Sequence, residues 1–171
     1  MISRLAGLKF VGITCCFMAL AACSKKDQPN LDAGLNGAPS GGAGIGQGAP
    51  GSKADFATNI GDRVFFLQDQ STLTPEATSI LTKQGAWLKQ YGQVTVQVEG
   101  HADERGTREY NIALSARRAT TTRNFLIQQG VQPTRISSIA YGKERPVALC
   151  DAEQCYSQNR RSVTVITGGA N

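Results

Sequence analysis

The chain has 171 residues, which is enough for one compact domain with additional segments. Its formal net charge is +5, but from Asp55 onward 13 Lys and Arg stand against 11 Asp and Glu, so the excess of cations lies mainly before the predicted domain. Such a balanced domain lacks the basic surface of a nucleic-acid binder, and no nucleic-acid partner is expected.

The first 22 residues have the pattern of a secretory signal peptide. They carry two basic residues and no acidic one, followed by an apolar run that is too short to span a membrane and ends in small residues. The end of this run, Leu20-Ala21-Ala22-Cys23, resembles the lipobox of bacterial lipoproteins. That resemblance predicts that Cys23 becomes the lipidated first residue of the mature protein and anchors it to a membrane. By resemblance to sorting signals, Ser24 favours the outer membrane, with the domain in the periplasm.

The alternative for Cys23 is ordinary signal cleavage that leaves a free thiol, which is a liability in an exported protein. Residues 23–54 are then expected to form the lipidated cysteine and a flexible tether, because the stretch is rich in Gly, Ala, Ser and Pro and has no aromatic residue. A coil of about 31 residues has a root-mean-square span on the order of 30 Å. The tether would let a domain reach a structure held away from the membrane.

Residues 55–171 are predicted to form the folded domain. Alternating or continuous apolar runs indicate strands, and the pair Thr74-Pro75 indicates a helix start with Thr as N-cap and Pro at the first position. The resulting order is β-α-β-α-β-β, which predicts an α/β fold of the α+β type: a two-layer sandwich with two main helices on one face of a mixed four-stranded sheet. In chain order the expected elements cover residues 64–68, 74–92, 93–102, 107–129, 136–141 and 162–167.

The second predicted helix carries an arginine where an apolar residue is expected. Arg118 falls on the same helix face as Leu114 and Leu126, where an unpaired guanidinium would be costly, so it needs a carboxylate partner. The preceding loop, GHADERGT, carries Asp103 and Glu104 and leads into a helix N-terminus. Asp103 and Arg118 therefore either flank one binding pocket or pair with each other to hold the loop.

The run EGHADERGTREYNIALSARRA closely resembles the signature of OmpA-like peptidoglycan-binding domains. Together with ISSIAYGKERP and YSQNRR, it extends the resemblance over residues 93–165 and points to the lipoprotein branch that works in the Tol–Pal system. The resemblance implies that Asp103 binds the ammonium of meso-diaminopimelate and Arg118 a carboxylate of the same residue. A zwitterionic ligand indeed needs one acid and one cation close together. Asn111 would orient the loop, donate to the ligand or cap the helix, and Arg161 aligns with a family arginine near the site.

The same resemblance implies a non-enzymatic protein that binds peptidoglycan without covalent chemistry and needs no cofactor and no metal. It would link the outer membrane to the cell wall, with TolB and TolA as partners, and support envelope integrity and outer-membrane constriction in cell division. Another OmpA-like lipoprotein with an assembly or stator role is the alternative within the fold. The first strand reads FFLQDQ rather than the family's FDFD-like run, which leaves its contribution to the pocket open.

The single histidine and a pair of nearby cysteines are the remaining residues with possible chemical roles. His101 is the only histidine, and no suitably spaced nucleophile or second metal ligand accompanies it, so a wall-remodelling hydrolase is disfavoured. Cys150 and Cys155 lie close together in an exported domain and are expected to form a disulfide, with two free thiols as the alternative. A ring this small adds only about 2 kcal/mol to stability in the chain-entropy treatment, so it would shape the loop rather than hold the fold.

Overall fold

The computed structural model describes residues 48–171, which belong to one compact unit. The predicted signal peptide, Cys23 and residues 23–47 of the predicted tether lie outside the described residues. Within residues 48–171, no helix is long and apolar enough to cross a membrane.

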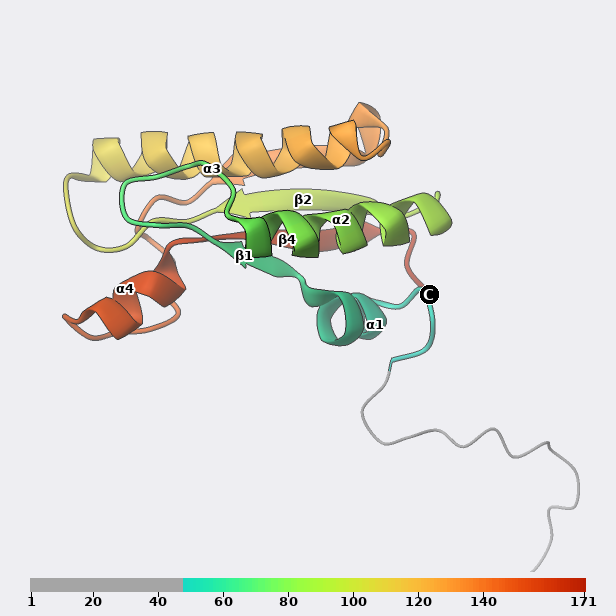
Figure 1. Ribbon diagram of the computed structural model, residues 1–171, viewed down its shortest axis with the longest axis horizontal. Coiled ribbons are helices and arrows are strands. Elements are labelled where there is room, and N and C mark those ends of the chain that lie inside the picture. Colours follow the sequence, from blue (N-terminus) through green and yellow to red (C-terminus); the bar gives the residue numbers. More distant parts are fainter. Residues whose placement is uncertain (1–47) are drawn as a thin grey trace, which may run out of the picture. The chain divides into compact units, whose positions relative to one another are not determined.

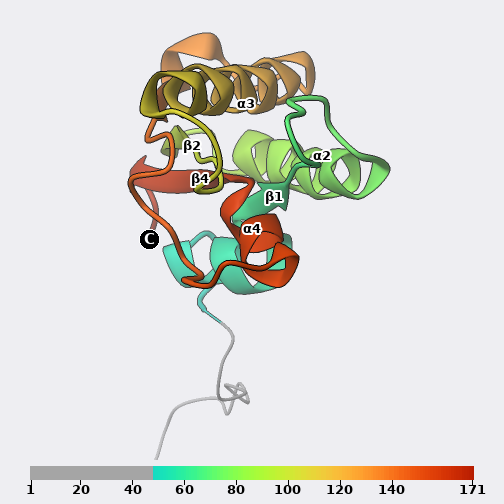
Figure 2. The same ribbon diagram turned by 90° about the vertical axis from the view of Figure 1, so that its left-hand side faces the viewer.

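The sheet has four strands in the order β1-β4-β2-β3, and only the β2–β3 pair is parallel. Helices α2 and α3 lie on one face of this mixed sheet (Figure 2), so the predicted two-layer fold is confirmed. In chain order the elements are α1 Lys53–Asp55, the π-helical turn η1 Phe56–Gly61, β1 Arg63–Phe65, α2 Pro75–Gln90, β2 Thr95–Gly100, α3 Arg108–Gln128, the 3-10 turn η2 Pro133–Arg135, β3 Ile136–Ala140, α4 Glu153–Asn159 and β4 Arg161–Gly168.

Local sequence explains where α2 begins and which face it buries. The Thr74 hydroxyl accepts a hydrogen bond from the backbone N–H of Ala77 at 3.2 Å, as the predicted N-cap requires. The apolar stripe of the helix packs on the valines of β2 in one core. Gln84 is fully buried in this stripe, but its amide is satisfied: it donates to the Gly61 carbonyl at 2.7 Å and accepts from the Thr164 hydroxyl at 2.8 Å.

The folded domain starts with a short helical segment that periodicity did not reveal. Ser52 caps α1 by accepting a hydrogen bond from the Asp55 N–H at 3.1 Å, so the segment expected to be the end of the tether contributes to the fold. The ring of Phe56 lies 4.9 Å from that of Trp87, and the Trp87 indole donates to the Asp55 carboxylate at 2.8 Å. These contacts attach the beginning of the domain to α2.

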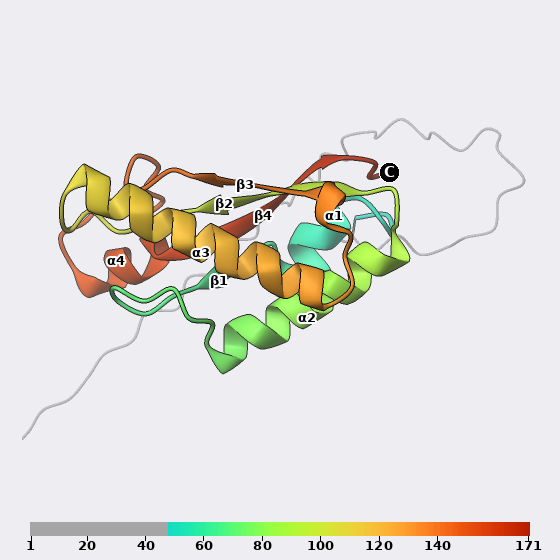
Figure 3. The same cartoon turned by 90° about the horizontal axis from the view of Figure 1, so that it is seen from above.

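Helix α3 approaches the end of β2 very closely at Gly100. A Cβ added to Gly100 would lie 2.0 Å from the carbonyl oxygen of Ser115, so no other residue fits without moving the helix. This approach places the middle of α3 directly over the loop that leaves β2. That loop, the loop after β1 and helix α4 meet at one end of the domain, whereas the C-terminus lies at the other (Figures 1 and 3).

Candidate functional site

The loop between β2 and α3 carries Asp103 and is held from several sides. The Asn111 side chain, buried on α3, donates to the Arg105 carbonyl at 2.8 Å. The Lys143 ammonium donates to the carbonyls of Glu104 and Gly106 at 3.2 and 2.8 Å. Asn111 therefore orients the loop, which is one of the roles expected for it. The backbone that presents Asp103 is fixed on both sides.

Asp103 is buried, with 8% of its surface exposed, and two guanidinium groups share one of its oxygens. Arg105 Nη2 donates to Oδ2 at 2.6 Å, and Arg160 Nη1 donates to the same oxygen at 3.3 Å. Burial alone would raise the pKa of Asp103, but the hydrogen bonds from Arg105 and Arg160 outweigh it and hold this pKa below its ordinary value. Asp103 is thus an ionised carboxylate held in place by cations.

Helix α4 supplies the acid that completes this cluster. Glu153 hydrogen-bonds Arg160 Nη2, and its other oxygen lies 3.8 Å from Arg105 Nη2. Arg160 also donates from Nε to the Phe66 carbonyl at 3.2 Å. Two acids and two arginines therefore alternate in one network, which we call the Asp103 cluster: Asp103, Arg105, Glu153 and Arg160.

Arg118 lies fully buried beneath the same end of the domain, and its donors go to backbone carbonyls. Its Nε, Nη1 and Nη2 donate to the carbonyls of Gln70, His101 and Leu67 at 2.8, 2.9 and 3.1 Å. Burial lowers the pKa of Arg118 to about 10, and the nearby charge of Asp103 opposes the shift. The guanidinium ties the loop after β1 to the loop after β2, while its charge has no directly bonded carboxylate within residues 48–171.

The sequence-predicted residues are only partly brought together. Asp103 and Arg118 lie near each other, but the ion pairs of Asp103 are made with Arg105 and Arg160 rather than with Arg118. Arg161 is buried away from Asp103 and donates to the carbonyls of Asn159 and Arg145 at 3.4 and 3.2 Å. Arg160 is the residue between α4 and β4, whereas Arg161 is the first residue of β4, and of the two only Arg160 reaches Asp103.

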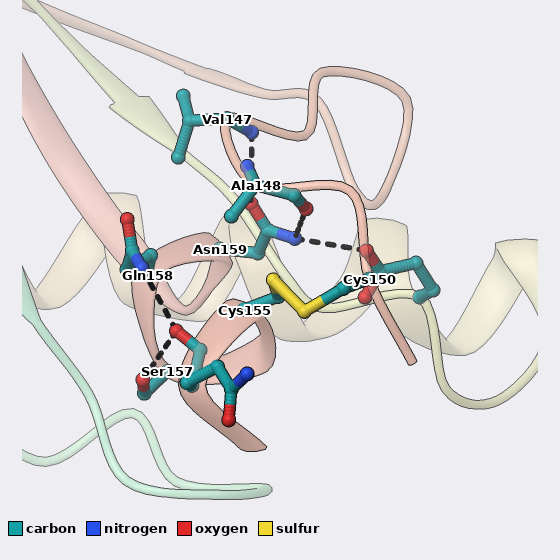
Figure 4. The surroundings of a disulfide bond; sticks show 9 residues. Val147, Ala148, Cys150, Cys155, Ser157, Gln158 and Asn159 are labelled. Atoms are coloured by element: carbon teal, nitrogen blue, oxygen red, sulfur yellow. Dashed lines mark hydrogen bonds between the residues drawn. A yellow bond between two sulfur atoms is a disulfide. The ribbon is translucent and has the colours of Figure 1, made fainter. Parts of the chain in front are cut away.

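The loop before β4 is organised by a disulfide and an asparagine (Figure 4). The sulfur atoms of Cys150 and Cys155 are bonded, with the two Cα atoms 5.7 Å apart. The Asn159 side chain accepts from the backbone N–H of Val147 at 2.8 Å and donates to Glu104 Oε1 at 2.9 Å. The six-residue ring closed by the disulfide contains Glu153, so this ring positions an acid of the Asp103 cluster.

A hollow of about 420 Å³ lies beside the cluster, between the end of β1 and α4, and most of its surface is apolar. Phe65 and Leu67 stay about half exposed in this region. The first strand therefore contributes apolar side chains next to Arg160, a point that its sequence left open. The lining residues are Phe65, Phe66, Leu67, Thr74, Glu76, Ser157, Gln158 and Arg160.

His101 is buried at the start of the loop after β2. Its ring stacks on Tyr141 with the centroids 5.5 Å apart, and neither ring nitrogen has a hydrogen-bond partner among the residues that the structure describes. In the same part of the chain, no group of three or more His, Cys, Asp or Glu is arranged to hold a metal ion.

Known proteins share this fold and much of this sequence. Residues 65–160 match the OmpA family. A peptidoglycan-associated lipoprotein of Mesorhizobium japonicum is 52% identical over 156 residues, covering 90% of this chain and 89% of the relative, and one of Pseudomonas aeruginosa is 42% identical over 157 residues. The crystal structure of the peptidoglycan-associated lipoprotein from Burkholderia pseudomallei superimposes with a TM-score of 0.61 at 35% identity, covering 62% of this chain and 90% of that one.

A more distant neighbour, the C-terminal domain of Helicobacter pylori MotB, has a TM-score of 0.59 at 22% identity and shows the fold alone. The helices, the mixed open sheet and the matched sequence define an OmpA-like domain. The chain belongs to the OmpA family and, within it, to the peptidoglycan-associated lipoproteins. It is accordingly a structural protein and not an enzyme.

Proposed function

We propose that this chain is an outer-membrane lipoprotein that binds peptidoglycan non-covalently at the Asp103 cluster. The observation that carries the proposal is that two opposite charges lie near each other without an ion pair between them: an ionised, fixed carboxylate at Asp103, and a buried guanidinium at Arg118 whose donors face carbonyls. A meso-diaminopimelate residue of the wall peptide presents an ammonium and a carboxylate on one carbon atom. Asp103 would bind the ammonium and Arg118 the carboxylate.

The position of Arg118 sets a condition on this binding. Two of its hydrogen bonds go to the carbonyls of Leu67 and Gln70, the two ends of one turn after β1. Because the side chain is fully buried, a ligand carboxylate reaches the guanidinium only when this turn shifts. The carbonyls of Gln70, His101 and Leu67 accept from three of its five N–H groups, so Nη1 and Nη2 each keep one N–H that a ligand carboxylate would engage in a charge-assisted hydrogen bond.

Family membership supports the rest of the proposal. The relatives are named for their association with peptidoglycan and for their lipid anchor. We infer the same for this chain, with Cys23 as the lipidated residue, the outer membrane as the anchoring membrane, and TolB and TolA as protein partners during outer-membrane constriction.

Sedimentation with purified cell walls tests the binding site. We expect the substitution Asp103→Asn to weaken binding to diaminopimelate-containing walls at least about tenfold, because a desolvated charge pair is lost. Walls that contain lysine instead should bind weakly, since lysine lacks the second carboxylate. Asp151→Asn, an exposed acid in the same region, is the matched control and should bind like the wild type. Arg118→Lys keeps the buried charge but loses the planar donor array, and should also bind weakly.

Unfolding curves for each variant separate a loss of the site from a loss of the fold. Undiminished binding by folded Asp103→Asn and Arg118→Lys proteins would refute the proposed site. The anchor and the partners have separate tests. Palmitate labelling that persists in Cys23→Ala would exclude lipidation at that residue, and failure to capture TolB would favour a different role within the same fold.

A further inference from the structure

The carboxylate proposed to bind the ligand is already engaged by two cations of the protein. Arg105 and Arg160 both donate to Asp103 Oδ2, at 2.6 and 3.3 Å. The backbone N–H of Arg105 lies 3.3 Å from the other oxygen, Oδ1. A ligand ammonium that approaches Oδ2 therefore competes with these two guanidinium groups for that oxygen, and one that approaches Oδ1 is repelled by their positive charges.

The two arginines differ in how firmly they are held. The Arg160 side chain is 6% exposed and also bonds Glu153 and the Phe66 carbonyl. The Arg105 side chain is 37% exposed, and Asp103 is the only residue to which its guanidinium donates a hydrogen bond in the described part of the chain. Arg105 is the cation that can leave, because its departure breaks fewer contacts and returns a charge to solvent rather than to the interior.

A second carboxylate partner for Arg105, Glu153, lies close to its present position beside Asp103. The carboxylate of Glu153 lies 3.8 Å from Arg105 Nη2, and the guanidinium carbon lies 4.4 Å from the centre of the Tyr156 ring. Both residues come from α4. A small rotation of the side chain would exchange Asp103 for Glu153 while the stacking on Tyr156 persists.

We propose that Arg105 is an internal competitor for the ligand's ammonium: it pairs with Asp103 until a ligand cation displaces it towards Glu153, while its guanidinium stays stacked on Tyr156. This inference rests on the proposed function in taking Asp103 as the ammonium acceptor. The ion pair between Arg105 and Asp103 must break when the ligand binds, so it lowers the affinity of the site for the ligand. Glu153 reduces this effect because it offers Arg105 another carboxylate partner. Residues outside the contact with the ligand thus set how tightly the wall is held.

The test is calorimetric titration of the whole protein, purified in detergent, with the tripeptide L-Ala-γ-D-Glu-meso-diaminopimelate. Arg105→Gln should bind about three- to fivefold more tightly than the wild type, the change that corresponds to losing an exposed ion pair. Arg108→Gln is the matched control: it removes the same charge three residues later, at the start of α3, where Arg108 pairs with Glu144 at 3.1 Å, and it should leave the affinity unchanged.

Glu153→Gln should weaken binding about three- to fivefold, because Arg105 then lacks its second partner. In a double variant that also carries Arg105→Gln, the weakening caused by Glu153→Gln should be smaller, since Arg105 is no longer present to move to Glu153. Equal or weaker binding by Arg105→Gln, or an equal gain in Arg108→Gln, would overturn the inference. Asp103→Asn separates a failure of the proposed binding site from a failure of the competition by Arg105. If it still binds the tripeptide, the proposed site itself fails, whereas its loss together with an unaltered Arg105→Gln affinity overturns only the competition.

Discussion

Lowering the pH from 7 to 5 is expected to destabilise the domain through one residue, His101. It is the single histidine of the chain and is 2% exposed. Burial, and then the charges of Arg161 and Arg145, lower its pKa from 6.5 to about 4. Glu99 Oε2, 3.6 Å from Nε2, favours the protonated ring but does not outweigh burial. The folded protein therefore favours the neutral form of the His101 ring.

The sign and size of the effect follow from proton linkage. The histidine of the unfolded chain has a pKa of about 6.5, so as the pH falls the unfolded chain binds a proton before the folded protein does. His101 therefore makes its full contribution to the free energy of unfolding above pH 6.5, and this contribution declines as the pH falls towards 4. Between pH 7 and pH 5 the loss in free energy of unfolding is about 2 kcal/mol. Carboxylates with lowered pKa values, such as Asp103 and Glu153, lose their contributions only at lower pH.

Urea unfolding at pH 7, 6 and 5 measures this loss, with His101→Asn as the comparison. The wild type should lose about 2 kcal/mol across the interval, and the variant less than about 0.5 kcal/mol, whatever its stability at pH 7. Parallel losses in the two proteins would show that other groups titrate in this range. A wild type of constant stability would show that the folded ring accepts a proton as readily as the unfolded one.

Two further predictions concern the geometry of the site. Gly100→Ala should lower the free energy of unfolding by about 3 kcal/mol or more, because the new methyl carbon would meet the Ser115 carbonyl at 2.0 Å. Gly92→Ala, with open space around the added carbon, should change the free energy of unfolding by less than about 0.5 kcal/mol. Similar urea midpoints for the two variants would refute the close approach at Gly100. Replacing Cys150 and Cys155 by Ser should cost about 2 kcal/mol in urea unfolding and leave the far-ultraviolet circular dichroism unaltered, whereas loss of the folded signal would contradict a merely local role for the disulfide.

The elements that sequence predicted well are those determined by local patterns. Thr74 and Pro75 define the start of α2 through a cap and a preset backbone angle, and neither depends on distant residues. The alternation of Val96 and Val98 predicts β2 in the same way. Helix α4 has no comparable signal in the sequence, since its seven residues are too few for a period. Its place depends on the Cys150–Cys155 ring and on the distant partners of Asn159.

The sequence predicts which face of α3 Arg118 lies on, but not the groups that it contacts. The spacing on α3 placed Arg118 on an inward face, and it is fully buried. The carbonyls that receive its side chain belong to Leu67 and Gln70, 51 and 48 residues earlier, and the path of a loop over such a separation is not encoded in any local pattern. Likewise, Arg160, the residue between α4 and β4, meets Asp103 across 57 positions of sequence, and no local pattern predicts such a contact.

The opposite placement of the chain ends and the Asp103 cluster has a mechanical consequence. The backbone N–H of Asn171 donates to the Gly51 carbonyl at 3.3 Å, so the described chain enters and leaves the domain at the end away from Asp103 (Figure 1). A pull between this end and a ligand held at the cluster would run parallel to β2 and β4. Ladder hydrogen bonds are perpendicular to the strands, so such a force loads many of them together instead of opening them one by one. Rupture under tension would then be slow even where the equilibrium stability is modest.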